Sequence, residues 1–410
     1  MRQKELQINY HTAPNGLRMV HVSLPRSAVG YMGVTVRVGS RDEDDASLGL
    51  AHFVEHTIFK GTRRRSSWHI INRMEAVGGE LNAYTTKEET VLYSVFPSGN
   101  LARAAELVAD LACNSQFPAK ELDKEREVVG DEIDSYLDSP SEAVYDDFED
   151  LLFAGSSIGH NILGSRKALE KFDPQVCRNY LARWYVPGNM VVFYAGNVGA
   201  DTVFAIMERS FASLSGDVPA TQRLLPVTVA TFDVHKAVDT HQCHTIMGAR
   251  IGGMSAPDRF ANALLTNILG GPGMNSLLNV NLRERNGLVY NVEASTGIFS
   301  DCGLLTIYYG CDPDDNDRCR RLVENTVASI AEGAITPRRF EMYKKQYLGQ
   351  LIVASENLES RVLGIARQTL FHGKASTAVR TIEAIKAVAL SELSAAAQSL
   401  SPLSKLTFGK

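Results

Sequence analysis

The chain has no stripe of basic residues interleaved with aromatic residues, which is the surface that nucleic-acid binding needs. Its formal net charge is −5 over 410 residues, so we expect no nucleic-acid partner. Long apolar runs are also missing. The run at 190–195 has the length of a strand and falls far short of the ~18 residues of a membrane-spanning helix. We therefore expect no membrane span.

The amino-terminal residues and the cysteines indicate a protein that is not exported. Residues 1–10 carry charges but no apolar core, so we expect no secretory signal and a mature protein that begins near residue 1. The six cysteines are scattered, and none forms a Cys-x-x-Cys pair. Without export, such thiols are expected to stay reduced. The predicted location is cytoplasmic.

Apolar residues are plentiful. They make up 44% of the chain and can fill large cores. At ~150 residues a domain, the length corresponds to two or three domains. The apolar period switches repeatedly between two and 3.6, and the predicted helices are long. This pattern indicates an α+β fold in which helices pack on sheets.

A linker is predicted near the middle of the chain. Residues 214–231 include Ser215-Gly216-Asp217-Val218-Pro219, a composition typical of a connecting segment. This linker would separate an N-terminal domain at 1–213 from a C-terminal domain at 232–410. It divides the chain nearly in half.

The two halves resemble each other in pattern. A strand, a glycine and a loop before a helix occur at 31–41 and again at 244–258. A hairpin followed by a helix occurs at 80–111 and again at 289–330. We therefore expect two similar domains that arose by duplication. The chemistry would remain in the first half, because the second half has no His-x-x-Glu-His sequence.

The sequence His52-Phe53-Val54-Glu55-His56 is the strongest local indication of chemistry. A helical residue turns by ~100°, so His52 and His56 stand one turn apart on the same face, with Glu55 beside His56. Burying these groups without a partner would cost several kcal/mol, and a metal ion is a suitable partner. The alternative is two helical histidines with an acid between them and no metal.

The surrounding sequence predicts a helix over 48–59. Ser47 is the predicted N-cap, and Gly61 ends the helix. The side opposite the histidines carries apolar residues that would face a core, namely Leu50, Val54 and Ile58.

A second predicted helix, at 119–137, offers a third ligand, which a catalytic zinc ion needs beside one open position. Its apolar stripe at heptad spacing consists of Leu122, Val129 and Tyr136. Glu125 and Glu132 occupy the stripe positions in between, where unpaired acids are rare. The alternative is a buried salt bridge to Lys or Arg. Asp131 lies ~100° off this stripe and is the weaker candidate ligand.

Together these residues resemble the inverzincin peptidases, the family of pitrilysin, insulinase and the mitochondrial processing peptidase. The family has an inverted His-x-x-Glu-His sequence, which matches 52–56. Its glutamate ligand lies in a later Glu-Arg-x-Val-x-x-Glu-like helix, which matches 125–132. In this resemblance the third ligand is Glu132, 76 residues after His56.

Two further segments resemble substrate-binding elements of that family, so the resemblance covers nearly the whole chain. The segment 78–85 resembles an edge strand that binds an extended peptide by strand addition, through Asn82, Ala83 and Tyr84. The segment 282–290 resembles an Arg/Tyr element, in which Arg283 and Tyr290 bind substrate carbonyls and stabilise a developing oxyanion. Without the resemblance, Tyr290 is a strand aromatic and Arg283 a solvated helical residue.

The resemblance implies half of an α+β clamshell, made of two similar domains that are each a mainly antiparallel sheet packed with helices. It implies one Zn²⁺ per chain, held by His52, His56 and Glu132. Glu55 would be the general base that activates a water molecule for attack on a peptide bond. Glu125 would orient a ligand histidine. The expected activity is that of a zinc metalloendopeptidase acting on short or unfolded peptides.

The expected partners are a peptide substrate and a second chain. A short, bacterial-type member with both the metal residues and the Arg/Tyr element would form a homodimer with shared sites, and a heterodimer with a related chain is the alternative. The rival function is a non-catalytic or partner-dependent subunit of a peptidase-like complex. Degenerate members of that kind lose metal-site residues. All four are present here, namely His52, Glu55, His56 and Glu132.

Overall fold

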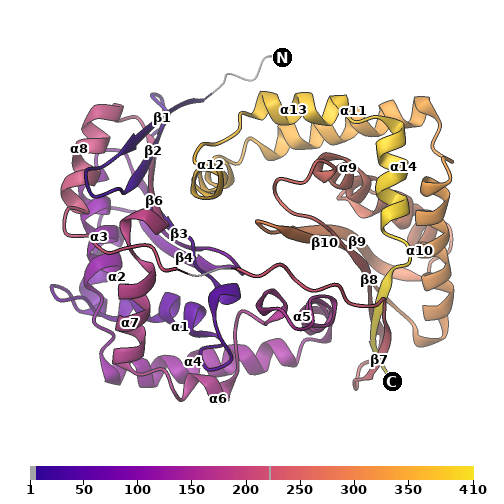
Figure 1. Ribbon diagram of the computed structural model, residues 1–410, viewed down its shortest axis with the longest axis horizontal. Helices are drawn as coiled ribbons and strands as arrows, with labels where there is room; N and C mark the ends of the chain where they lie inside the picture. Colours follow the sequence, from indigo (N-terminus) through magenta and orange to yellow (C-terminus); the bar gives the residue numbers. More distant parts are fainter. Residues whose placement is uncertain (1–5, 221–222) are drawn as a thin grey trace. The chain divides into compact units, whose positions relative to one another are not determined.

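Two compact units make up the protein in this computed structural model, which describes residues 6–220 and 223–410 (Figure 1). The first unit comprises the chain up to Ile133, His160–Arg223 and Asn357–Thr377. The second comprises Asp134–Gly159, Leu224–Glu356 and the chain from Ala378. Each unit thus draws on both halves of the sequence. The domain boundaries at 1–213 and 232–410 stay a prediction.

A six-stranded sheet forms the centre of the first unit, in the order β1-β2-β6-β3-β5-β4. Its strands are β1 (Gln7–Thr12), β2 (Arg18–Ser23), β3 (Val29–Val36), β4 (Glu80–Thr85), β5 (Thr90–Pro97) and β6 (Met190–Gly196). Strands β2 and β6 are parallel, and the other neighbours are antiparallel. Strand β4 pairs with β5 alone and is therefore an edge strand.

Helices cover both faces of this sheet, which explains the continuous apolar run of β6. Because strand side chains alternate between faces, Met190 and Val192 enter one core, and Val191 and Phe193 enter the other. The first core also contains residues of α1 (Leu50–Thr57), α2 (Ser67–Glu75), α3 (Leu101–Asn114), α4 (Ala119–Leu137), α6 (Arg166–Leu169), α7 (Pro174–Trp184) and α8 (Ala200–Ser210). Helix α12 (Leu358–His372) packs on the opposite face.

A five-stranded sheet forms the centre of the second unit, in the order β7-β11-β8-β10-β9. Its strands are β7 (Asp233–Ala237), β8 (Cys243–Gly252), β9 (Val289–Ile298), β10 (Cys302–Cys311) and β11 (Ser404–Gly409). Around it lie α5 (Pro140–Leu152), α9 (Arg259–Gly270), α10 (Asn316–Ala331), α11 (Pro337–Ala354) and α14 (Leu390–Ser399). Helix α13 (Ala378–Ala387) packs against α9 and α11. The prediction of an α+β protein with mainly antiparallel sheets and packed helices is confirmed.

The two sheets repeat one topology. In the first, β2 is parallel to β6, followed by the antiparallel strands β3, β5 and β4. In the second, β7 is parallel to β11, followed by the antiparallel strands β8, β10 and β9. The corresponding strands also come in the same order along the chain. The predicted similarity between the two domains is therefore a similarity of strand order and direction.

Two expectations from composition can be compared directly with this structure. Each of the six cysteines, all within the described residues, is a free thiol. Among the helices of residues 6–220 and 223–410, none combines the length and the apolar character needed to cross a membrane.

Candidate metal centre

Helix α1 presents two histidines and a glutamate on the side away from its core face. Leu50, Val54 and Ile58 are buried, as the spacing predicts. The helix spans Leu50–Thr57 and continues as a short 3₁₀ turn to Lys60. The predicted end at Gly61 is therefore correct.

The start of α1 differs from the prediction. Ser47 is not the N-cap, because its hydroxyl donates to the Asp44 carboxylate and the helix begins after Gly49, whose φ is 88°. Instead, the two carboxyl oxygens of Glu43 accept the Gly49 N–H at 2.8 Å and the Ala51 N–H at 2.6 Å. Burial raises the pKa of Glu43 to about 8, although these two backbone bonds oppose the shift. A carboxyl group from the preceding loop thus accepts backbone N–H groups at the start of the helix, which have no partner within the helix.

Three side chains converge where α1 meets α4. Glu132 Oε2 lies 3.8 Å from His52 Nε2 and 3.4 Å from His56 Nε2. One ligand atom from each residue falls within 4.8 Å of the others. Two ligands of a tetrahedral zinc ion, each at ~2.1 Å from it, are about 3.4 Å apart. The three side chains therefore have metal-ligand spacing with little adjustment.

The two glutamates of α4 have different environments. The Glu125 side chain is 9% exposed, which agrees with the predicted core-facing position. The Glu132 side chain is 45% exposed, so the same prediction was wrong for Glu132. The stripe is therefore buried at Leu122, Glu125 and Val129 but exposed at Glu132. Asp131 is 83% exposed and pairs with Arg166 at 3.1 Å, so it does not join the cluster.

Glu125 fixes the orientation of His56. Its Oε1 lies 3.2 Å from His56 Nδ1, and its Oε2 lies 2.6 Å from Lys60 Nζ. Burial alone would raise the pKa of Glu125, but the bonds to His56 and Lys60 lower it. An ionised carboxylate only accepts hydrogen bonds, so Nδ1 donates, and Nε2, which faces Glu132, is the nitrogen that can bind a metal when it carries no proton. The salt bridge weighed as an alternative for Glu125 is also present, with Lys60.

The two histidines titrate differently. Burial, followed by the charge of His56, lowers the pKa of His52 to about 4. Burial also acts to lower the pKa of His56, but Glu125, Glu55 and Glu132 outweigh it and raise the value. The buried Nδ1 of His52 has no hydrogen-bond partner among the described residues. His52 is therefore neutral at pH 7, as a metal ligand must be.

Glu55 lies between the cluster and the edge strand. Its Oε2 accepts a hydrogen bond from Thr85 Oγ1, at the end of β4, at 3.3 Å. Burial raises the pKa of Glu55, partly opposed by His56 and Thr85 and assisted by Glu132. A carboxylate with a raised pKa is a better proton acceptor near neutral pH.

The three residues of the predicted peptide-binding strand lie in β4, which ends at Thr85, the residue that contacts Glu55. Asn82, Ala83 and Tyr84 are each half-buried and pair with β5 on one side only. The opposite edge of β4 has no partner strand within the described sheet. A peptide in extended form could pair there through its main chain.

Arg283 and Tyr290 belong to the second unit, where the structure brings them together. The Arg283 guanidinium lies 5.8 Å from the centre of the Tyr290 ring. Tyr290 is 83% exposed at the start of β9, the edge strand that corresponds to β4. Arg283 lies in a π-helical turn, Asn279–Glu284.

Sequence reasoning missed Lys60, Thr85 and Glu43. Lys60 stands four residues after His56, so helical spacing could have placed Lys60 beside His56, the histidine that contacts Glu125. Thr85 directly follows the predicted peptide-binding residues. Glu43 carries no comparable signal, because its contact with α1 depends on the path of a loop.

Two family models match consecutive parts of the chain. Residues 18–166 match the model described as insulinase, peptidase family M16, and residues 171–347 match the M16 inactive domain. An uncharacterized zinc protease of Mycobacterium tuberculosis is 34% identical over 402 residues, covering 95% of this chain and 90% of the relative. The chain belongs to peptidase family M16. The resemblance inferred from the sequence is thereby confirmed.

One further relative and two solved structures also match nearly the whole chain. The uncharacterized zinc protease YmxG of Bacillus subtilis is 30% identical over 393 residues, covering 96% of this chain and 95% of YmxG. A protease structure from Helicobacter pylori matches with a TM-score of 0.89 at 20% identity, covering 99% of this chain and 100% of that one. A structure of a peptidase M16 inactive domain from Pseudomonas fluorescens matches with a TM-score of 0.92 at 17% identity, covering 98% of each. At such identities, the two structures show the shared M16 fold.

The candidate residues fall into two groups, each within a different M16 match. The first, at 18–166, contains His52, Glu55, His56 and Glu132, whereas the second, at 171–347, contains Arg283 and Tyr290.

Proposed function

We propose that this M16 chain is a zinc metalloendopeptidase that cleaves short or unfolded peptides. The observation that carries the proposal is the convergence of His52, His56 and Glu132, whose ligand atoms lie within 4.8 Å of one another. Glu55 lies on the same helix, one residue before His56. The relatives named zinc proteases support the same activity.

The donor set fits zinc. Two imidazole nitrogens and one carboxylate oxygen are the ligands of a catalytic zinc site, and three protein ligands would leave the fourth position for water. One zinc ion per chain would supply an activated water at neutral pH and polarise the peptide carbonyl. Two features of the chain would favour binding of this ion: His52 is neutral, and His56 Nε2 faces Glu132.

The remaining roles belong to the residues of the chain. Glu55 takes a proton from the attacking water and delivers it to the leaving amine. Thr85 holds the Glu55 carboxylate towards β4, where the peptide would lie. Asn82, Ala83 and Tyr84 present a free main-chain edge, which binds peptides with little dependence on sequence. Glu125 restrains the His56 ring through Nδ1.

Arg283 and Tyr290 complete the proposed site from a second copy of the chain. Their mutual contact and the 83% exposure of Tyr290 suit groups that meet a substrate carbonyl. Because one chain carries both the metal residues and this pair, a homodimer would contain two shared sites. A heterodimer with a related chain is the alternative.

A rival function is that of a non-catalytic or partner-dependent subunit. The observation that favours it is the match of residues 171–347 to the M16 inactive domain. The candidate metal residues lie outside that match, within the insulinase match. This location favours the active peptidase.

Metal analysis combined with peptide cleavage tests the proposal. Wild type and Glu55→Gln should each bind one zinc ion per chain, and only wild type should cleave a quenched fluorescent unfolded peptide. Glu75→Gln, an exposed glutamate on α2, is the matched control and should cleave like wild type. A wild-type chain that binds no zinc and cleaves no unfolded peptide after zinc addition would falsify the proposal.

A further inference from the structure

A second polar site lies in the first unit, in a pocket of about 510 Å³ that none of the candidate metal residues lines. The loop after α1 contributes to its wall, together with α2, α3 and the end of α8. Four arginines line the pocket, namely Arg64, Arg73, Arg103 and Arg209. Two carboxylates line it as well, those of Glu106 and Asp110.

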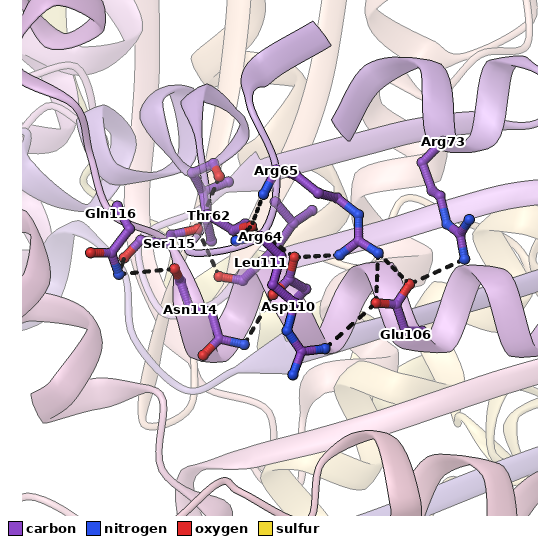
Figure 2. Close-up of polar contacts among 11 residues, drawn as sticks. Thr62, Arg64, Arg65, Arg73, Glu106, Asp110, Leu111, Asn114, Ser115 and Gln116 are labelled. Carbon is purple, nitrogen blue, oxygen red and sulfur yellow. Dashed lines mark hydrogen bonds and ion pairs between the residues drawn. The ribbon is translucent and has the colours of Figure 1, made fainter. Parts of the chain in front are cut away.

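Both carboxylates are already occupied by Arg65, which is not part of the lining. Arg65 Nη1 lies 2.5 Å from Asp110 Oδ2, and Nη2 lies 2.6 Å from Glu106 Oε1 and 2.8 Å from Oε2. Figure 2 shows the Arg65 guanidinium between the two acids, joined to each by dashed lines. Asp110 also accepts hydrogen bonds from Thr62 and Asn114. Glu106 also pairs with two arginines of the lining, Arg73 at 3.3 Å and Arg64 at 4.0 Å (Figure 2). The two acids are therefore shared among several guanidinium groups.

The lining arginines nevertheless keep guanidinium N–H groups that neither carboxylate accepts. Arg73 donates to Glu106 at 3.3 Å, but its buried Nε has no partner among the described residues. Arg103 donates one N–H to the Arg73 carbonyl at 2.7 Å. Arg209 is exposed and forms no ion pair within the described part of the chain. Each guanidinium carries five N–H groups, so most donors of these side chains remain available.

The charges of this cluster do not balance. Five arginines, with Arg65 included, face two carboxylates, which leaves a surplus of three positive charges. The whole chain has a net charge of −5, so the surplus is a local feature. A recess with a surplus of positive charge concentrates anions.

We propose that this pocket binds a small organic molecule that bears a phosphate group. Guanidinium groups from α2, α3 and α8 offer donors from three elements, which suits a tetrahedral dianion with several oxygens better than a flat carboxylate. The volume lies within the ~300–1,000 Å³ of small-molecule pockets and exceeds what a bare phosphate needs. Ala102, Ala109 and Ala212 supply uncharged wall for the organic part.

Calorimetric titration with glycerol 3-phosphate and with inorganic phosphate tests the proposal. Wild type should bind one glycerol 3-phosphate per chain, and the affinity should fall as salt is added. Loss of a charge-assisted hydrogen bond costs about tenfold or more in affinity, so Arg103→Gln and Arg209→Gln should each bind at least tenfold more weakly. Neither side chain pairs with a carboxylate in the described residues, so both variants should fold, which circular dichroism can verify.

Two matched variants locate the binding. Arg26→Gln removes an exposed arginine of the same unit that does not line the pocket, and it should bind like wild type. His56→Gln should also bind like wild type, because the metal centre is a separate site. The proposal is overturned if wild type shows no binding up to about 10 mM glycerol 3-phosphate. It is also overturned if Arg26→Gln loses as much affinity as the two pocket variants, or if His56→Gln loses affinity. Binding of inorganic phosphate without glycerol 3-phosphate would also contradict an organic ligand.

Discussion

His56 and Glu125 are joined by a hydrogen bond, with Nδ1 and Oε1 at 3.2 Å, while His56 Nε2 points towards Glu132. One carboxylate therefore fixes the tautomer of a candidate zinc ligand and leaves the other nitrogen for the metal. Lys60 holds the second oxygen of Glu125 at 2.6 Å. The orientation of His56 is thus set by a residue 69 positions further along the chain.

Glu125→Gln should weaken zinc binding by about 10- to 100-fold, the usual cost of losing a partner behind a metal ligand. Glu125 helps to raise the pKa of His56, so the substitution should lower that pKa and reduce competition from protons. The loss of affinity should therefore be largest above neutral pH and smaller in acid. Zinc titration with a competing chelator across a pH series measures both effects.

Glu127→Gln is the control for this experiment, because Glu127 is exposed on the same helix. It should bind zinc like wild type at every pH. A pH-independent loss in Glu125→Gln would contradict the proposed effect on His56.

Glu132→Gln should reduce zinc affinity by more than tenfold, whereas Asp131→Asn should leave it unchanged. The physical reason is geometric: Glu132 lies 3.4 Å from His56 Nε2, while Asp131 is 83% exposed and pairs with Arg166. An amide oxygen is also a weaker zinc ligand than a carboxylate. Elemental analysis of the two purified variants provides the comparison. A larger zinc loss in Asp131→Asn would reverse the ligand assignment.

Glu43→Gln should change how stability depends on pH. Burial raises the pKa of folded Glu43 to about 8 from an ordinary value of 4.5, so the folded state holds the proton more tightly than the unfolded state. This group's contribution to stability is complete below the ordinary value and is lost as pH rises through about 8. The unfolding free energy of wild type should therefore fall relative to Glu43→Gln between about pH 5 and 9, on the order of a few kcal/mol.

Urea unfolding at several pH values, with metal removed by chelator, gives this difference directly. The exposed Glu75 provides the reference, and Glu75→Gln should follow the wild-type curve. A difference between wild type and Glu43→Gln that stays constant over the pH range would contradict the assigned shift.

Mixed subunits should reveal whether sites are shared. Tyr290→Phe and Glu55→Gln should each lose activity, about a hundredfold or more if Tyr290 assists the oxyanion. In a homodimer with shared sites, random mixing restores one intact site in half of the dimers, so about one quarter of wild-type activity should return. A mixture no more active than its components would contradict shared sites, and a monomeric mass in solution would contradict the dimer.

Much of the fold can be predicted from the sequence, because the apolar patterns of helices and strands are local. The strand of β6 follows from one apolar run, and the limits of α4 agree with the predicted 119–137. The predicted match of 80–111 with 289–330 corresponds to β4, β5 and α3 against β9, β10 and α10, which the repeated topology supports. Helix α12 was not predicted to join the first unit, because its contacts with β6 are remote in sequence.

The sequence by itself determined the family and the arrangement of groups along single helices. His52, Glu55 and His56 are close because of helical periodicity, and Glu125 and Glu132 share one stripe for the same reason. Only the tertiary structure decided that Glu132 is exposed, that Glu125 contacts Lys60, that Glu43 caps α1 and that five arginines gather around two acids. Those relationships join loops and helices far apart in the chain, and they depend on packing that no local period encodes.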